Sequence, residues 1–229
     1  MKYKLIINCK NYEESTGSNF LKLVHACRDL EERAKQLNVD LILSPSTIDL
    51  RESISNKIQT YAQHIDAKNP GSQTGYTIPK ILKNIGIQGT IISHSEHFLD
   101  NEEIKKTISY AKELGITTCV CARDATAAEE IALLEPDMIA VEPKELIGGD
   151  ISISTARPQL ISESLDAIER GSLNLSNQPQ LLVGAGVKND IDVRKAVELG
   201  ARGILVASGV VKAQDPKAAI ENLLEGFRE

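Results

Sequence analysis

The sequence predicts a single (β/α)8 barrel with parallel strands that spans residues 1–229. Eight short apolar runs recur along the chain, and a helical pattern follows each run. Most runs are nearly continuous Ile, Leu and Val, which is typical of parallel strands that are buried on both faces. No linker or low-complexity tract divides the 229 residues, and such barrels contain about 250 residues.

The apolar runs predict eight strands in order. The first run is short and ends in the polar residue Asn8, so it is neither a signal peptide nor a membrane span. The fifth contains Cys119 and Cys121, whose side chains diverge on one face of a strand and cannot bridge each other. We expect these two, with Cys9 and Cys27, to be buried reduced thiols. The expected strands are residues 4–8, 39–43, 59–63, 90–93, 117–121, 138–141, 180–183 and 203–206.

The helical segments have recognisable ends. Asp100 and Glu103 form a start that resembles a capping box, and Gly115 ends the apolar stripe that follows. Asp215 and Pro216 place an acid at an N-cap and proline at the first helical position. Further helices are expected at residues 18–36, 47–55, 79–85, 125–133 and 158–170, and before Gly200.

An open, doubly wound sheet is the rival fold. It usually carries a G-x-G-x-x-G sequence after its first strand. The first run here is followed by Cys9, Lys10, Asn11 and Tyr12, which contain no glycine. The closed barrel is therefore the better prediction.

Composition limits the partners. The net charge is −6 and the pI about 5.4, which argues against broad binding of nucleic acid or of an anionic membrane. The spacing of cysteines and histidines shows no zinc-ligand pattern, so we expect no metal. The unpaired cysteines predict a cytoplasmic protein.

In such barrels the chemistry gathers where the strands end. Glu142 ends the sixth run, where burial can raise the pKa of a carboxyl group as a general base requires. Pro143 then restricts Glu142 to an extended backbone. The other polar or glycine-bearing tips are Asn8, Lys10, Gln63, His64, His94, Ser95, Glu96, Gly184, Gly186, Ala207, Ser208 and Gly209.

These tips resemble the triosephosphate isomerase family, after which the TIM barrel is named, over essentially the whole chain. The order and spacing match at N-x-K (Asn8, Lys10), H-S-E (residues 94–96), E-P…I-G (residues 142–148) and the two last glycine turns. The short loops are most similar to those of the compact archaeal branch of the family. The resemblance implies interconversion of dihydroxyacetone phosphate and D-glyceraldehyde 3-phosphate through an enediolate, without a cofactor, in glycolysis and gluconeogenesis.

The resemblance also implies site roles. Glu142 would move the proton between two carbons, while His94, a neutral imidazole beside a helix N-terminus, would polarise the carbonyl. Lys10 would stabilise the oxyanion and the phosphate, and Asn8 would orient Lys10 or the substrate. Glu96 is the second acid, which either handles protons or supports Lys10. The pairing of a basic carboxylate with a neutral imidazole is this family's well-known pattern and comes with the resemblance alone.

By the same resemblance, the phosphate is expected at backbone N–H groups close to small residues. Residues 143–149 would form a lid that closes over the substrate and excludes water. The expected substrate-binding residues are Asn8, Lys10, Ile147, Gly148, Gly184, Gly186, Ala207 and Ser208.

The chain departs from the family pattern in several places. Gly149 and Asp150 replace the usual end of the lid, and we expect Asp150 to face solvent or cap the next helix. Glu145 replaces a bulky apolar residue and could anchor the lid by hydrogen bonds. His97 stands where relatives carry arginine, and we expect His64 at a rim or interface.

The loop that starts at Gly71 and ends at Gly75 resembles the one that docks beside Lys10 of a neighbouring subunit. Its tip would be Thr74. This implies a homo-oligomer, either a dimer or a tetramer.

Other functions are possible on such a barrel. An aldolase would need a Schiff-base lysine, and runs five to seven contain none. A metal-dependent epimerase would need more His and Asp strand ends than His64 and His94. The remaining alternative is a catalytically silent or altered phosphosugar-binding barrel.

Overall fold

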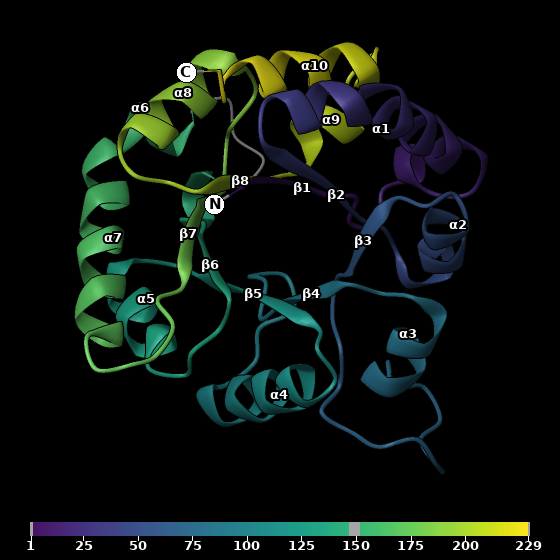
Figure 1. Ribbon diagram of the computed structural model, residues 1–229, viewed down its shortest axis with the longest axis vertical. Coiled ribbons are helices and arrows are strands. Elements are labelled where there is room, and N and C mark those ends of the chain that lie inside the picture. The colour runs from purple at the N-terminus through teal and green to yellow at the C-terminus, as the bar shows by residue number, and fades with distance from the viewer. Residues whose placement is uncertain (1, 147–151, 229) are drawn as a thin grey trace.

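The computed structural model describes residues 2–146 and 152–228, and its strands form one closed barrel in sequence order. Figure 1 shows the strands as an inner ring, with the helices outside it. The predicted fold class is confirmed, and most strands lie within one residue of their expected positions. The strands are β1 Tyr3–Asn8, β2 Val39–Ser44, β3 Gln59–Ala62, β4 Gly89–Ile92, β5 Thr117–Ala122, β6 Met138–Val141, β7 Gln180–Val183 and β8 Gly203–Val206.

The barrel closes where β8 meets β1. Lys4 pairs with Gly203 and Ile7 with Val206, and both strands run in the same direction. Gly203 permits this approach, because a Cβ there would lie 2.9 Å from the Cβ of Lys4. Since every neighbouring pair of strands is parallel, the carboxyl ends of all eight meet at one rim.

Helices follow the strands as the apolar stripes predicted, with two differences. Residues 47–55 form a short 3-10 helix and then a short α-helix, and α6 was not expected because four residues are too few for a periodic pattern. The α-helices are α1 Ser18–Gln36, α2 Leu50–Ser55, α3 Pro79–Ile85, α4 Asn101–Glu113, α5 Ala125–Ala132, α6 Ile153–Ala156, α7 Pro158–Ser172, α8 Asp190–Glu198, α9 Ser208–Val211 and α10 Pro216–Glu225. The 3-10 helices are η1 Glu13–Ser15, η2 Thr47–Asp49 and η3 Lys144–Leu146.

The predicted caps are present. Asp100 accepts a hydrogen bond from the Glu103 N–H at 2.9 Å, and Asp215 accepts one from the Ala218 N–H at 3.1 Å. Gly115 lies just after α4 with φ +61°, a backbone that glycine adopts without strain. The two N-caps fix where α4 and α10 begin, and so limit the length of the segments that lead to them from the rim.

Two apolar layers hold the barrel. One fills the inside of the strand ring, and a larger one lies between the strands and the helices. Tyr61 is the largest inner side chain, and its ring occupies the space that a Cβ of Gly89 would need. All four cysteines are buried and free, as expected. The inner layer is made of Ile6, Ile42, Tyr61, Ile91, Cys119, Cys121, Met138, Ala140, Leu182 and Leu205.

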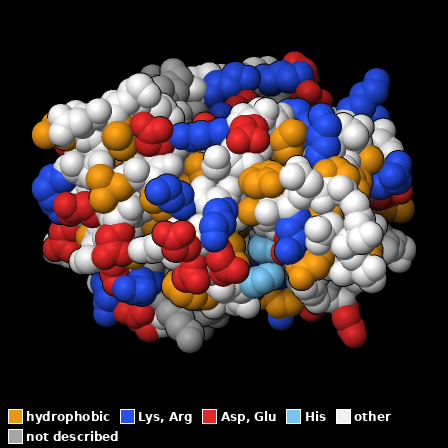
Figure 2. Space-filling model, turned by 90° about the horizontal axis from the view of Figure 1, so that it is seen from below, with side chains coloured by type: hydrophobic (Ala, Val, Ile, Leu, Met, Phe, Trp, Pro, Cys, Tyr) orange, Lys and Arg blue, Asp and Glu red, His pale blue; other side chains and the backbone are white. Residues whose placement is uncertain are grey.

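The surface carries both signs of charge. On the face in Figure 2, acidic and basic side chains are interspersed, and hydrophobic side chains are scattered among them. Among the described residues, no helix combines the length and the apolar character that crossing a membrane requires.

Candidate active site

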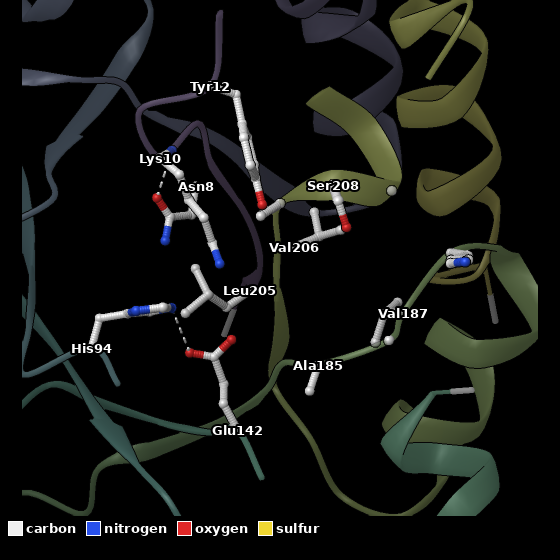
Figure 3. A pocket seen from close by; sticks show the side chains of 14 residues that line it. Asn8, Lys10, Tyr12, His94, Glu142, Ala185, Val187, Leu205, Val206 and Ser208 are labelled. Carbon is white, nitrogen blue, oxygen red and sulfur yellow. Dashed lines mark hydrogen bonds and ion pairs between the residues drawn. The ribbon is translucent and has the colours of Figure 1, made fainter. Parts of the chain in front are cut away.

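Polar side chains from three strand ends line one pocket at the rim. Asn8 ends β1 and Lys10 follows it, His94 follows β4, and Glu142 follows β6. Figure 3 shows these side chains pointing toward the same space, which the turns after β7 and β8 close on the other side. The convergence expected from the sequence is therefore present in the structure.

The backbone after β1 is bent so that Lys10 enters the pocket. Lys10 has φ +49°, a backbone conformation that residues other than glycine rarely adopt. The Lys10 N–H donates to Oδ1 of the buried Asn8 at 3.0 Å, and Gln63 Nε2 donates to the Lys10 carbonyl at 2.9 Å. These bonds hold the strained turn. Asn8 thus holds the backbone of Lys10.

The ammonium of Lys10 is held by an acid from another loop. Lys10 Nζ lies 2.6 Å from Oε1 of Glu96. The Lys10 side chain is 11% exposed, whereas that of Glu96 is 55% exposed. The positive charge is therefore sheltered inside the pocket, while its counter-charge stays close to water.

His94 has a defined tautomer. The Glu96 N–H donates to His94 Nδ1 at 3.2 Å, so Nδ1 is an acceptor and the proton of a neutral ring lies on Nε2. Burial, and secondly the charge of Lys10, lower the pKa of His94. The N–H comes from the turn after β4 and not from a helix N-terminus, since α4 begins only at Asn101. A neutral imidazole thus points its N–H into the pocket.

Glu142 is a buried carboxylate beside this imidazole. Burial is the main cause that raises its pKa to about 7, and the Cys121 thiol and Lys10 oppose the rise. Its Oε2 lies 3.4 Å from His94 Nε2 and has no hydrogen-bond partner among the described residues. A buried oxygen without a partner is poorly stabilised as an anion, and it is correspondingly basic toward a substrate proton.

The turns after β7 and β8 form the opposite wall. Ala185 and Gly186 both have positive φ, +67° and +72°, which turns the backbone sharply after β7. The Lys188 N–H donates to Asp192 Oδ2 at 3.0 Å, and Ser152 donates to the other oxygen of Asp192 at 2.5 Å. Asp192 therefore connects this turn to the segment that leads into α6.

Comparison with known proteins agrees with this geometry. The family model for triosephosphate isomerase matches residues 4–224. The chain belongs to the triosephosphate isomerase family. It is 42% identical over 223 residues to the triosephosphate isomerase of Cenarchaeum symbiosum, covering 97% of each chain. It is 38% identical to that of Thermoplasma volcanium, covering 97% of this chain and 100% of the relative. Identity with the enzyme of Methanocaldococcus jannaschii is 37%, over 96% and 98% of the two chains.

The remaining residues predicted from the family pattern lie in different places. Gly186, Ala207 and Ser208 line the pocket, whereas Gly184 lies against Glu142. Ile147 and Gly148 fall outside the described residues, as do Gly149 and Asp150.

Glu145 and His64 lie in the segments that follow β6 and β3 at the rim of the barrel. Glu145 forms an ion pair at 2.7 Å with Arg157, the N-cap residue of α7. His64 stacks on His97 with ring centroids 4.3 Å apart, in the hollow that also contains Lys10 and Glu96.

Two residues at the site were not identified from the sequence. Tyr12 lines the pocket, and Cys121 touches Glu142 from β5. Tyr12 lies only two residues after Lys10, and this spacing was the available signal. The position of Cys121 depends on the pairing of β5 with β6, which places Cys121 next to Ala140.

The Gly184→Ala variant of this isomerase-family site is expected to lose about a hundredfold in kcat while it stays folded. A Cβ at Gly184 would lie 2.5 Å from Cγ and 2.7 Å from Cδ of Glu142, so the carboxylate would be displaced by about 1 Å. Steady-state kinetics and circular dichroism measure both effects. Ser162→Ala, at an exposed position of α7, is the control, and a Gly184→Ala protein with unchanged kcat would contradict the prediction.

Proposed function

We propose that this chain interconverts dihydroxyacetone phosphate and D-glyceraldehyde 3-phosphate, with Glu142 as base and His94 as the polarising acid. The observation that carries the proposal is the 3.4 Å distance between Glu142 Oε2 and His94 Nε2 in the pocket that also contains Lys10. A base, a neutral N–H donor and a fixed cation are what an enediolate intermediate requires. Residues 1–229 are proposed to form one barrel domain.

The proton transfer is assigned to Glu142. Its carboxylate takes a proton from the carbon beside the carbonyl group, and the electrons of that C–H bond form the C=C bond of the enediolate. The same oxygen then returns the proton to the neighbouring carbon. The raised pKa of Glu142 favours the first step, because a stronger base lies closer in pKa to the carbon acid.

The charge that develops on oxygen is assigned to His94 and Lys10. The Nε2–H of His94 donates to the carbonyl oxygen, and it can pass a proton between the two oxygens as the double bond moves. Lys10 adds a fixed positive charge in a partly buried site, where electrostatic interactions are stronger than in water. Glu96 is proposed as a positioning residue, since its side chain holds Lys10 and its N–H fixes the His94 tautomer.

The phosphate is placed at the wall made by Gly186, Ala207 and Ser208, with Asn8 and Lys10 at the pocket's other side. Small side chains leave backbone N–H groups accessible to an anion. Ile147 and Gly148 are proposed to complete this wall when the lid closes.

A homo-oligomer is proposed because a hollow lies beside the catalytic groups. The hollow is lined by Lys10, His94 and Glu96 together with residues from the ends of β2 and β3. Ile48 and Tyr76, which are next in the chain to the lining residues Thr47 and Thr77, are 81% and 48% exposed. A second copy's loop, residues 71–75, would fill the hollow and shield Lys10 from water.

The Thr74→Arg variant is expected to be monomeric and to lose at least about tenfold in kcat/KM, because loss of the docked loop would leave Lys10 and His94 more hydrated and less well placed. Light scattering at working concentration and kinetics measure the two effects. Thr155→Arg, at an exposed position of α6, is the control. A wild-type monomer with full activity would refute the proposed assembly.

The proposed setting is cytoplasmic glycolysis and gluconeogenesis, with no cofactor. A coupled assay in both directions tests the function: purified protein should turn over either triose phosphate. Protein that binds inorganic phosphate but shows no turnover would instead be the silent phosphosugar-binding barrel.

A further inference from the structure

Tyr12 is a pocket residue without a role in the mechanism described above. It is half-buried and lines the same pocket as His94, Glu142 and Ser208. Figure 3 shows its ring entering from the loop after β1, with the hydroxyl at the pocket end and on the side of Val206 and Ser208. The hydroxyl therefore faces the wall where the phosphate is proposed to lie.

The loop that carries Tyr12 is held at its backbone. Ser15 donates from its N–H and its hydroxyl to the Tyr12 carbonyl, both at 3.1 Å. The same hydroxyl donates to the Cys9 carbonyl at 2.7 Å. The backbone of Tyr12 is thus tied to the strained turn that aims Lys10, and its side chain is directed across the pocket.

Lys212, which is distant from Tyr12 in the sequence, contacts the Tyr12 ring. Lys212 Nζ lies 4.2 Å from the centre of the Tyr12 ring, a distance at which a cation and an aromatic face attract each other. Lys212 is the C-cap of α9, and its N–H donates to the Ser208 carbonyl. The contact therefore connects the loop after β1 with the helix after β8, across the phosphate end of the pocket.

We propose that the Tyr12 hydroxyl donates a hydrogen bond to the substrate phosphate, and that Lys212 is a positioning residue that holds the Tyr12 ring. A phenol is a suitable donor, because a hydrogen bond to a phosphate oxygen is strengthened by the negative charge. The substrate part of this proposal rests on the proposed function, whereas phosphate binding can be measured without turnover.

The test is the Tyr12→Phe variant, which removes one oxygen and keeps the ring. We expect KM for glyceraldehyde 3-phosphate and the inhibition constant of inorganic phosphate to rise together, by roughly tenfold or more, with kcat within about threefold of wild type. Turnover of unphosphorylated D-glyceraldehyde should not change. Tyr3→Phe is the matched control, since Tyr3 lies at the other end of β1 and packs on Phe227.

The role of Lys212 is tested with Lys212→Met, alone and combined with Tyr12→Phe. Alone it should weaken phosphate inhibition by about two- to fivefold, and in the Tyr12→Phe background it should have no further effect. Additive effects would overturn the positioning role of Lys212. Tyr12→Phe with unchanged KM and phosphate inhibition, or with a lowered kcat alone, would overturn the phosphate contact.

Calorimetry with inorganic phosphate separates this inference from the proposed function. Wild-type protein that binds phosphate more tightly than Tyr12→Phe, yet turns over no triose phosphate, would refute the isomerase function and support the phosphate contact. If wild type and Tyr12→Phe bind phosphate equally and wild type turns over triose phosphate normally, the phosphate contact is refuted and the isomerase function is supported.

Discussion

The Glu142→Gln variant is expected to lose at least about two to four orders of magnitude in kcat, with KM changed far less. Glutamine has the size and hydrogen-bonding length of glutamate but cannot accept a proton from carbon. Glu142 is 8% exposed and its Oε2 lies 3.4 Å from His94 Nε2, so solvent has little access to the position of the base. Steady-state kinetics in both directions measure the loss.

The dependence of kcat/KM on pH is a second test of the role of Glu142. Catalysis needs the ionised carboxylate, and burial raises the pKa of Glu142 from 4.5 to about 7. The value of kcat/KM should therefore rise with pH through this higher range and decline below it. The exposed Glu113→Gln is the matched control. Near wild-type turnover by Glu142→Gln would show that another group moves the proton.

The Lys10→Met variant is expected to lose about a hundredfold to a thousandfold in kcat/KM, with effects on both kcat and KM. Methionine keeps the apolar stem and removes the ammonium that would face both the oxyanion and the phosphate. The fold should survive, because the remaining partner Glu96 is 55% exposed and stays hydrated. Kinetics and the inhibition constant of inorganic phosphate measure the two parts of the loss.

Lys105→Met on the exposed face of α4 controls for the loss of one positive charge. Glu96→Gln is the informative companion, because it keeps the His94 contact through its backbone N–H but weakens the hold on Lys10. It should lose much less activity than Lys10→Met. Equal losses would mean that Glu96 itself handles protons, the other role considered for it.

Much of this fold was predictable because its signals are local. Continuous apolar runs mark strands that are buried on both faces, and residues such as Asp100 and Asp215 mark helix starts with their own side chains. Strand order followed from the strict alternation of strands and helices. The four residues of α6 were missed, because a single turn has no period to detect.

The site was less predictable because its geometry comes from contacts between distant segments. The tips Lys10, His94 and Glu142 could be found from strand ends, but the tautomer of His94 depends on one N–H in a turn. Gly184 was expected to bind substrate, and only the structure shows that it lies against the side chain of Glu142. The contact between Tyr12 and Lys212 joins residues 200 positions apart, which no local pattern reveals.

The central claim is that Glu142 carries a proton between two carbons of the substrate. Solvent exchange tests it most directly: dihydroxyacetone phosphate is incubated with the protein in D₂O, and deuterium in the recovered triose phosphates is followed by NMR. Wild-type protein should place deuterium on carbon, while Glu142→Gln should place none and still bind inorganic phosphate within about twofold of wild type. Deuterium appearing at the wild-type rate in Glu142→Gln would contradict the account.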